Sequence, residues 1–521
     1  MSPRGVRRRS SMARKDAVAL ALVVLAASCA PAGSPAAGPL TSGPAGSGTK
    51  PPLDHVIVIY LENRPFDQVF GLFPGAEGIA QAGPAATQVD RNGKPYEVLP
   101  PLRGATPNTT RPPTQLPDNL PNRPFDLQPF VPMDQTFNIA GAEAGNRFYQ
   151  EQMAINGGKM DRFVSVSTSL TMGYYDGRSL AMWKLAEQYV LADHFFHATF
   201  GGTGPNHLWL FCACTATWPN APADIVAQVA TDGTLIKDGV VTPDGYLVNN
   251  WTPDQAKLIP RQSAPHIGDR LDAAGVSWAW YTAGWSAGQY ASVFAPFAFF
   301  PTTASGTPGA TRHLKDEEDF LAALKGSDLP AVAIVKPALN AHPIQGPGLV
   351  AGDRHTAELV KAIQDSAYWK SAAIIVAFDE GGGLWDHVAP PKIDRWGPGT
   401  RVPAIIVSPY AKKGFVDKTV YDTTSILRFI EWRRQGEQPA ERVRLQPEAL
   451  SRVARLRPPS CEASRVPISG RALPRPRSPP APRRAARRVR DTWKVRRRSS
   501  RPDGRTRSTT DRRRAPRRCR S

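Results

Sequence analysis

Four short apolar runs limit the folds that this chain can adopt. They are His55–Leu61, Ala331–Val335, Ala372–Phe378 and Ala404–Val407. Each run is rich in Val and Ile and lacks regular alternation, which is typical of strands buried on both faces. Between them lie helical patterns at Ser179–Tyr189, His266–Ala274, Glu317–Leu324 and Thr356–Ile363. Strands that alternate with helices predict a layered α/β fold.

Acidic side chains follow two of the predicted strands directly. Glu62-Asn63 comes after the first run and Asp379-Glu380 after the third. Open α/β sheets bind ligands at the carboxyl ends of their strands. Carboxylate and amide oxygens are also the ligands that a hard divalent cation prefers. We therefore expect these residues to hold a metal; the alternatives are a helix cap for Glu62-Asn63 and a solvated turn for Asp379-Glu380.

Two further segments carry reactive groups. Thr203 stands between glycines in the run 201–207, where the backbone can turn sharply and expose the hydroxyl. An alcohol becomes a nucleophile only when a base or a metal removes its proton; the alternative is a structural turn threonine. The run 379–391 adds a third acid and His387, which we expect either to contact the metal or to orient its ligands.

The net charge of +20 belongs to one end of the chain. Residues 432–521 hold 29 of the 65 Lys and Arg and 7 of the 45 Asp and Glu, a net of +22, which leaves −2 for residues 1–431. This tail mixes Arg and Pro without hydrophobic period, so we expect it to be disordered. A frameshift product, a segment that binds an anionic surface and a simple solvated tail are the three interpretations. No specific nucleic-acid partner is expected.

The N-terminal segment 1–29 has the pattern of an export signal. A basic stretch precedes a short apolar run that is too brief to span a bilayer. The run ends at Cys29 in a sequence similar to a bacterial lipobox, which predicts a lipid anchor on Cys29; the alternative is ordinary cleavage nearby. Residues 30–52 are rich in Ala, Pro, Gly and Ser and predict a flexible linker. Residues 53–431 then form the folded domain.

Three smaller expectations concern the body of the chain. Residues 90–133 are crowded with Pro and Asn and predict a long loop or insertion. Cys212 and Cys214 are one residue apart, too close for an unstrained disulfide, so we expect two small buried side chains. His194 and His197 lie in an apolar stretch and are expected to be packed.

Several ordered motifs resemble the bacterial phospholipase C and acid phosphatase family. Asp54–Gly71 is similar to its strand followed by Glu-Asn-Arg-Ser-Phe-Asp, with Pro65 in place of Ser. Phe378–Pro391 resembles its Asp-Glu-x-Gly-Gly-x-x-Asp-His-Val-x-Pro-Pro element. Further similar segments are Thr203–Leu208, Ile267–Tyr281, Arg401–Tyr410 and Tyr421–Glu431. The resemblance covers about residues 54–431, and Ile267–Tyr281 looks more like the acid phosphatase branch.

The resemblance implies an alkaline-phosphatase-like three-layer α/β sandwich with a largely parallel central sheet. It makes Thr203 the nucleophile, which would form a phospho-enzyme. It also implies one divalent metal ion of unknown identity, with these ligands: Glu62, Asn63, Thr203, Asp379 and Glu380. His342 would bind the phosphoryl oxygens or protonate the leaving group. The other substrate-binding residues would be Asn206, His207 and His387.

Two departures bear on activity. His207 stands where the family usually has Arg. The segment 293–297 aligns with one that often carries two histidines, but here reads Val-Phe-Ala-Pro-Phe. We expect a secreted or lipid-anchored, metal-dependent phosphomonoesterase. The alternatives are a phospholipase C that acts on phosphodiester lipids and a catalytically degenerate surface lipoprotein.

Overall fold

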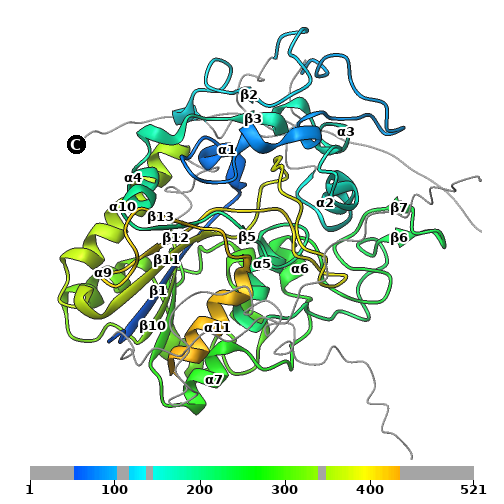
Figure 1. The fold of residues 1–521 in the computed structure, drawn as a ribbon. Helices are drawn as coiled ribbons and strands as arrows, with labels where there is room; N and C mark the ends of the chain where they lie inside the picture. Colours follow the sequence, from blue (N-terminus) through cyan, green and yellow to red (C-terminus); the bar gives the residue numbers. More distant parts are fainter. Residues whose placement is uncertain (1–51, 103–115, 136–144, 338–347, 435–521) are drawn as a thin grey trace, which may run out of the picture. The chain divides into compact units, whose positions relative to one another are not determined.

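A computed structural model describes residues 52–102, 116–135, 145–337 and 348–434 (Figure 1). Its centre is an eight-stranded sheet in the order β13-β4-β12-β11-β1-β10-β8-β9. The strands are β1 (His55–Leu61), β4 (Val190–Ala192), β8 (Trp278–Thr282), β9 (Leu314–Lys315), β10 (Val332–Lys336), β11 (Ala372–Phe378), β12 (Ala404–Val407) and β13 (Phe415–Asp417). Three of the four predicted strands have the expected bounds, and the fourth, β10, is shifted by one residue to include Lys336.

The sheet is largely parallel, as predicted. Among its described strands, β12 alone runs antiparallel to its neighbours β11 and β4. β1 pairs with β11 over its whole length, from His55 opposite Ala372 to Leu61 opposite Phe378. On its other side β1 pairs with β10, where Ile59 lies opposite Val335. This register brings the residues that follow β1, β10 and β11 to one edge of the sheet.

Helices cover both faces of the sheet and complete three layers (Figure 1). On one face lie α4 (Ala181–Gln188), α9 (Glu317–Lys325) and α10 (Leu349–Asp365). On the other lie α5 (Thr203–Cys212), α7 (Ile267–Ala273) and α11 (Thr423–Arg434). The predicted helix at 356–363 is the middle of the longer α10. The α/β sandwich with a largely parallel sheet is therefore confirmed.

Smaller elements connect these layers. The helices among them are α1 (Phe66–Phe70), α2 (Phe148–Ile155), α3 (Phe163–Val166), α6 (Pro253–Ala256) and α8 (Pro308–His313). The strands are β2 (Phe125–Asp126), β3 (Gly173–Tyr174), β5 (Phe195–Phe196), β6 (Gln228–Val229), β7 (Leu235–Lys237) and β14 (Tyr421–Asp422). In the described part of residues 90–133 the chain is mostly irregular, in line with the predicted insertion.

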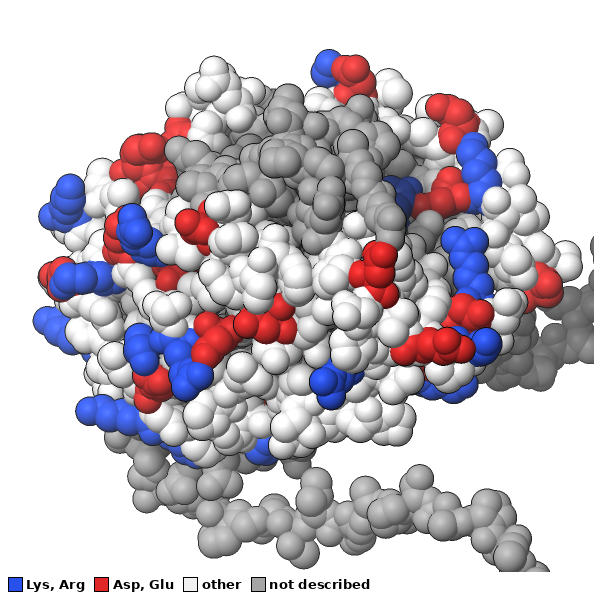
Figure 2. Space-filling model, turned by 90° about the horizontal axis from the view of Figure 1, so that it is seen from above, with Lys and Arg blue, Asp and Glu red and all other residues white. Residues whose placement is uncertain are grey.

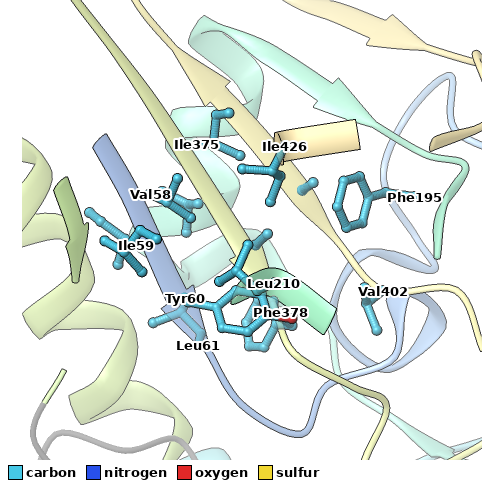
Figure 3. Close-up of a cluster of buried hydrophobic side chains, with 14 of the residues drawn as sticks. Val58, Ile59, Tyr60, Leu61, Phe195, Leu210, Ile375, Phe378, Val402 and Ile426 are labelled. Atoms are coloured by element: carbon cyan, nitrogen blue, oxygen red, sulfur yellow. The ribbon is translucent and has the colours of Figure 1, made fainter. Parts of the chain in front are cut away.

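The core lies where the central strands meet the helices. Figure 3 shows side chains of β1 and β11 clustered with Leu210 of α5 and Ile426 of α11. Val58 and Phe378 are at most 1% exposed. Each large aliphatic or aromatic side chain that is buried in this way contributes about 1.5–3 kcal/mol. This burial fixes the strand register on which the edge of the sheet depends.

The expectation for Cys212 and Cys214 is wrong, because the two residues form a disulfide. Cys212 ends α5, and Ala213 takes a left-handed conformation with φ 49°. The chain therefore turns back at once, which leaves the two Cα atoms 5.1 Å apart. That separation is within the range that disulfides span.

The surface of the described part carries charges of both signs. On the face in Figure 2, Lys and Arg are interspersed with Asp and Glu rather than gathered into a patch of one sign. This agrees with the net charge of −2 for residues 1–431. Within the described ranges, none of the helices combines the length and apolar character needed to cross a bilayer.

Candidate active site

Three buried carboxylates meet at the edge of the sheet. Glu62 follows β1, Asp379 and Glu380 follow β11, and all three residues are at most 3% exposed. Asn63 has φ 63°, a left-handed conformation that Asn tolerates better than most residues. Its backbone N–H donates to Asp379 Oδ1 at 3.1 Å, and its amide donates to Glu62 Oε2 at 3.0 Å. The turn after β1 thus joins the two acidic segments.

Thr203 is the first residue of α5, and it faces these acids. Its hydroxyl donates to Glu380 Oε1 at 3.3 Å. Gly204 lets the start of α5 pack closely on Trp251, because a Cβ there would lie 2.6 Å from the Trp251 ring. The free N–H groups and the dipole at a helix N-terminus favour an anion such as phosphate. Thr203 is therefore placed where a phosphate ester could meet both a hydroxyl and a positive helix end.

A buried network fixes the loop that precedes Thr203. The Asn206 amide donates to the carbonyls of Thr199, Gly201 and Gly202, and its Oδ1 accepts from the Thr199 N–H at 3.2 Å. These contacts use the whole amide group. We therefore assign Asn206 to positioning the loop before Thr203 rather than to the substrate contact that the resemblance implied.

Glu151, a buried residue of α2, also holds this loop. Its Oε2 accepts from the Gly201 N–H at 2.6 Å, and its Oε1 lies 2.8 Å from Nε2 of His197. Burial lowers the pKa of His197, but the neighbouring Glu151 carboxylate outweighs this effect and the pKa is raised. His197 is fully buried, so the expectation of a packed histidine is confirmed.

The electrostatics of the three acids favour a bound cation. Burial, Glu380 and Glu62 together raise the pKa of Asp379 well above its usual range. Burial also raises the pKa of Glu380 to about 7. Asp379 Oδ2 is buried and accepts no hydrogen bond from the described residues. A divalent cation would supply that missing partner and offset the repulsion, so the oxygen donors present fit a hard metal ion.

Two residues that sequence reasoning missed complete this cluster. Lys336, the last residue of β10, is fully buried with its Nζ 3.0 Å from Glu62 Oε1. The only sequence signal was a Lys at the end of an apolar run. Asn146 donates from Nδ2 to Glu380 Oε1 at 2.9 Å. It follows a segment without regular pattern, so nothing in the sequence marked it.

His207 and Phe294 form the wall behind the acids. His207 is fully buried, with Nδ1 2.9 Å from the Thr203 carbonyl and 3.7 Å from Asp379 Oδ2. Its ring stacks on Phe294 at 5.5 Å between centroids, and Lys336 Nζ lies 4.3 Å from the Phe294 ring. The segment 293–297, where the resemblance has histidines, therefore does reach the site.

His387 belongs to a second buried cluster. Its Nδ1 lies 2.6 Å from Asp67 Oδ2, and Asp67, Asp386 and His387 together could hold a metal ion. Arg401 already donates to both acids, at 3.0 Å to Asp67 Oδ1 and 3.0 Å to Asp386 Oδ1. Because this guanidinium compensates their charge, these two acids need a cation less than Glu62, Asp379 and Glu380, of which Lys336 reaches only Glu62.

Burial and neighbouring charges also shift the pKa values of the second cluster. Burial raises the pKa of Asp386 to about 6 even though Arg401 lowers it. Burial lowers the pKa of His387, but Asp67 outweighs this and raises it. His342 and Cys29 lie outside the described residues, as do the predicted signal and nearly all of the predicted linker and tail. The first three residues of the predicted tail, 432–434, are described and belong to α11, so the helix runs past the expected boundary.

The arrangement defines a class: an α/β protein with a hydroxyl beside a cluster of buried oxygen donors at the carboxyl edge of a largely parallel sheet. The model of the Phosphoesterase family matches residues 53–435, and the chain belongs to that family.

Curated relatives carry phospholipase C names. The chain is 27% identical over 429 residues to the non-hemolytic phospholipase C of Pseudomonas aeruginosa, which covers 73% of this chain and 54% of the relative. It is 25% identical over 432 residues to the non-hemolytic phospholipase C of Burkholderia pseudomallei, and the match covers 74% of this chain and 56% of that relative. Phospholipase C A of Mycobacterium tuberculosis is 25% identical, covering 73% and 72%. The chain thus spans about half the length of the first two relatives.

Solved structures with a similar chain path are more distant. A protein of the alkaline phosphatase superfamily from Vibrio parahaemolyticus has 11% identity and a TM-score of 0.29, covering 50% of this chain and 61% of its own. The lipoteichoic acid synthase LtaP from Listeria monocytogenes has 11% identity and a TM-score of 0.31, covering 51% and 68%. The fold assignment above rests on the strand order.

Replacing Arg401 by Met should lower the free energy of unfolding by about 3–5 kcal/mol, because it leaves buried Asp67 and Asp386 without their counter-ion. Arg395 is a matched control, since it also forms an ion pair with an Asp, but at the surface. Arg395→Met should cost at most about 1 kcal/mol. Urea unfolding of both variants checks this, and equal losses would contradict the assigned role of Arg401.

In chelator, the protein should lose stability as the pH rises. The pKa of Glu380 is about 7 in the folded protein against 4.5 for an ordinary Glu, so its stabilising contribution is complete below pH 4.5 and is lost as the pH passes 7. Glu380→Gln should lose less stability over this interval. Urea unfolding of metal-free protein on both sides of that window measures the difference, and identical pH profiles would refute it.

Proposed function

We propose that the protein hydrolyses phosphate esters, with Thr203 as the nucleophile and a divalent cation bound by Glu62, Asn63, Thr203, Asp379 and Glu380. The contact of the Thr203 hydroxyl with Glu380 at a helix N-terminus carries this proposal. Membership of the Phosphoesterase family supports it. When bound, the cation would lower the pKa of the Thr203 hydroxyl and neutralise charge on the phosphate.

The reaction proceeds in two steps. Thr203 Oγ1 loses its proton to solvent and forms a bond to phosphorus, while the bond from phosphorus to the ester oxygen breaks and that oxygen takes up a proton and leaves as an alcohol. His342 is our candidate for the group that supplies this proton. Water then attacks phosphorus, which releases phosphate and restores the Thr203 hydroxyl. At the start of α5 the Gly204 N–H donates to Asn250 Oδ1 at 2.7 Å and Pro205 has no N–H, so the Thr203 N–H is the backbone donor that would bind a phosphoryl oxygen in both steps.

The residues around Thr203 prepare it for attack. Glu151 and Asn206 hold the loop 199–202, so the hydroxyl needs little reorientation. Lys336, at 3.0 Å from Glu62, brings a positive charge to the wall of the pocket. We propose that Lys336 and His207 take the place of the histidines absent from 293–297.

We propose a phosphomonoester as the substrate, following the resemblance of Ile267–Tyr281 to the acid phosphatase branch. The aromatic residues there do not offer a lipid surface, because Trp278 and Trp280 lie in β8 and are at most 4% exposed. A phosphodiester lipid is the second candidate, because the curated relatives above are named phospholipase C. Export through residues 1–29, with lipid attachment to Cys29, completes the proposal.

The test measures hydrolysis of p-nitrophenyl phosphate and of p-nitrophenylphosphorylcholine, each with and without chelator. Thr203→Ala should lower the rate on the preferred ester by at least about 1,000-fold, because no other hydroxyl replaces the nucleophile. Thr203→Ser keeps a hydroxyl and should retain most of the activity. The ratio of the two rates decides between the monoester and the diester.

Three outcomes would count against the proposal. Full activity in chelator would show that hydrolysis needs no metal ion. Full activity of the Thr203→Ala variant would show that Thr203 is not the nucleophile. No hydrolysis of either ester by folded, metal-loaded protein would favour the degenerate lipoprotein.

A further inference from the structure

His197 is a fully buried residue that joins three segments of the chain. Its Nε2 lies 2.8 Å from Oε1 of Glu151 on α2, and 3.2 Å from the hydroxyl oxygen of Thr400, which precedes β12. Its Nδ1 lies 3.4 Å from Oδ1 of Asn206 on α5. Gly399 lets the chain pass close to this ring, because a Cβ there would lie 2.1 Å from Cε1 of His197.

The contacts of Glu151 favour its charged form. Its Oε2 accepts from the Gly201 N–H at 2.6 Å, and its Oε1 accepts from the Thr400 N–H at 2.9 Å. Hydrogen bonds of this kind stabilise a carboxylate over the neutral acid. A carboxylate that is buried needs a cation beside it. Among the described residues, the side chain within ion-pair distance of Glu151 is His197.

The other ring nitrogen of His197 also faces an acceptor. The orientation of the Asn206 amide is fixed because its Nδ2 donates to three backbone carbonyls, so the atom that faces His197 is the amide oxygen. A neutral imidazole has one N–H, whereas the imidazolium donates from both nitrogens. With the Glu151 carboxylate at Nε2 and the Asn206 oxygen at Nδ1, the charged form satisfies both contacts and the neutral form satisfies one.

The imidazolium supports both groups that hold the loop before Thr203. The Glu151 carboxylate binds the Gly201 N–H, and the Asn206 amide binds the carbonyls of Gly201 and Gly202. Loss of a proton from either ring nitrogen would set its lone pair against those of an oxygen. One of the two supports would then move away from the ring, and Thr203 would shift with the loop. A displacement of about 1 Å near the reacting atoms can lower a rate about 100-fold.

We propose that His197 carries a positive charge at neutral pH and is a positioning residue for Thr203, so that hydrolysis is lost when the imidazolium gives up its proton. The inference rests on the proposed function, in which Thr203 is the nucleophile. His197 acts through Glu151 and Asn206, which hold the loop. Burial lowers the pKa of His197, but the main charged groups that act on it, Glu151 from α2 and Glu380 from the loop after β11, are acidic and together raise it.

The charge of His197 can be measured in the full chain without any reaction. Protein with isotopically labelled histidine is titrated with alkali while the ring nitrogens are followed by NMR, and His197→Gln identifies the signals of His197. Both nitrogens should still carry protons at about pH 7.5, above the ordinary histidine pKa of 6.5. In Glu151→Gln the proton should leave at lower pH, because the carboxylate is gone. That shift identifies the same signals if His197→Gln does not fold.

The positioning role is tested by kcat for the preferred ester as a function of pH. In the wild type kcat should fall over the interval in which His197 loses its proton, while KM changes little. Glu151→Gln should show this fall at lower pH, and at about pH 7.5 its kcat should be about 100-fold below the wild type. Glu317→Gln is the matched control, because it removes the carboxylate of another pair, His355 and Glu317 at 2.6 Å, and should leave the kcat profile unchanged.

A second measurement of the loop needs no substrate. Protection of the amides in 199–202 against hydrogen exchange should fall over the same pH interval, so a protein that hydrolyses neither ester would end the proposed function and still decide the role of His197. A neutral His197 at about pH 7 would overturn the proposal. So would a charged His197 whose titration changes neither kcat nor loop protection. A Glu151→Gln variant that loses the same fraction of kcat at every pH would leave the pair as a structural contact only.

Discussion

The mutual repulsion of Glu62, Asp379 and Glu380 is the constraint around which this edge of the sheet is organised. The seven-residue register between β1 and β11 brings these carboxylates together out of water. Burial and repulsion both disfavour their charged forms. The surrounding contacts partly offset this unfavourable free energy, since Asn63, Asn146 and Lys336 each bring a donor to one of the acids. A cation is the further compensation that we propose, and Oδ2 of Asp379, which accepts no hydrogen bond from the described residues, marks where it would act.

Arg401 has the corresponding role in the neighbouring cluster. A single buried guanidinium binds Asp67 and Asp386, and also the main chain at Glu77 and Asp193. It thereby links the segments after β1, β4 and β11, which are far apart in the sequence. Two clusters of buried acids at one sheet edge are thus compensated differently. Arg401 binds both acids of one cluster, whereas Lys336 reaches one of the three acids of the other, for which we propose an ion.

The two central strands, the acids that follow them and the position of Thr203 could be predicted from the sequence. β1 and β11 are apolar runs buried on both faces, so their bounds and the acids that follow them are visible without a structure. Thr203 was found through its glycines and the family resemblance, and it does lie beside Glu380.

Lys336 and Asn146 escaped prediction because their roles depend on tertiary contacts with residues far along the chain. Asn206 was expected to bind substrate beside Thr203, but its bonds to three carbonyls could not be read from spacing. The disulfide of Cys212 was missed because it requires the left-handed turn at Ala213.

The most direct test of the central claim is to trap the covalent intermediate. Metal-loaded protein is mixed with a phosphate ester, quenched in acid within one turnover and digested, and the phosphorylated peptide is identified by mass spectrometry. The account predicts a phosphoryl group on Thr203 and its loss when metal is removed before mixing. A phosphoryl group on another residue, or ester cleavage in that first turnover without any phosphorylated peptide, would contradict it.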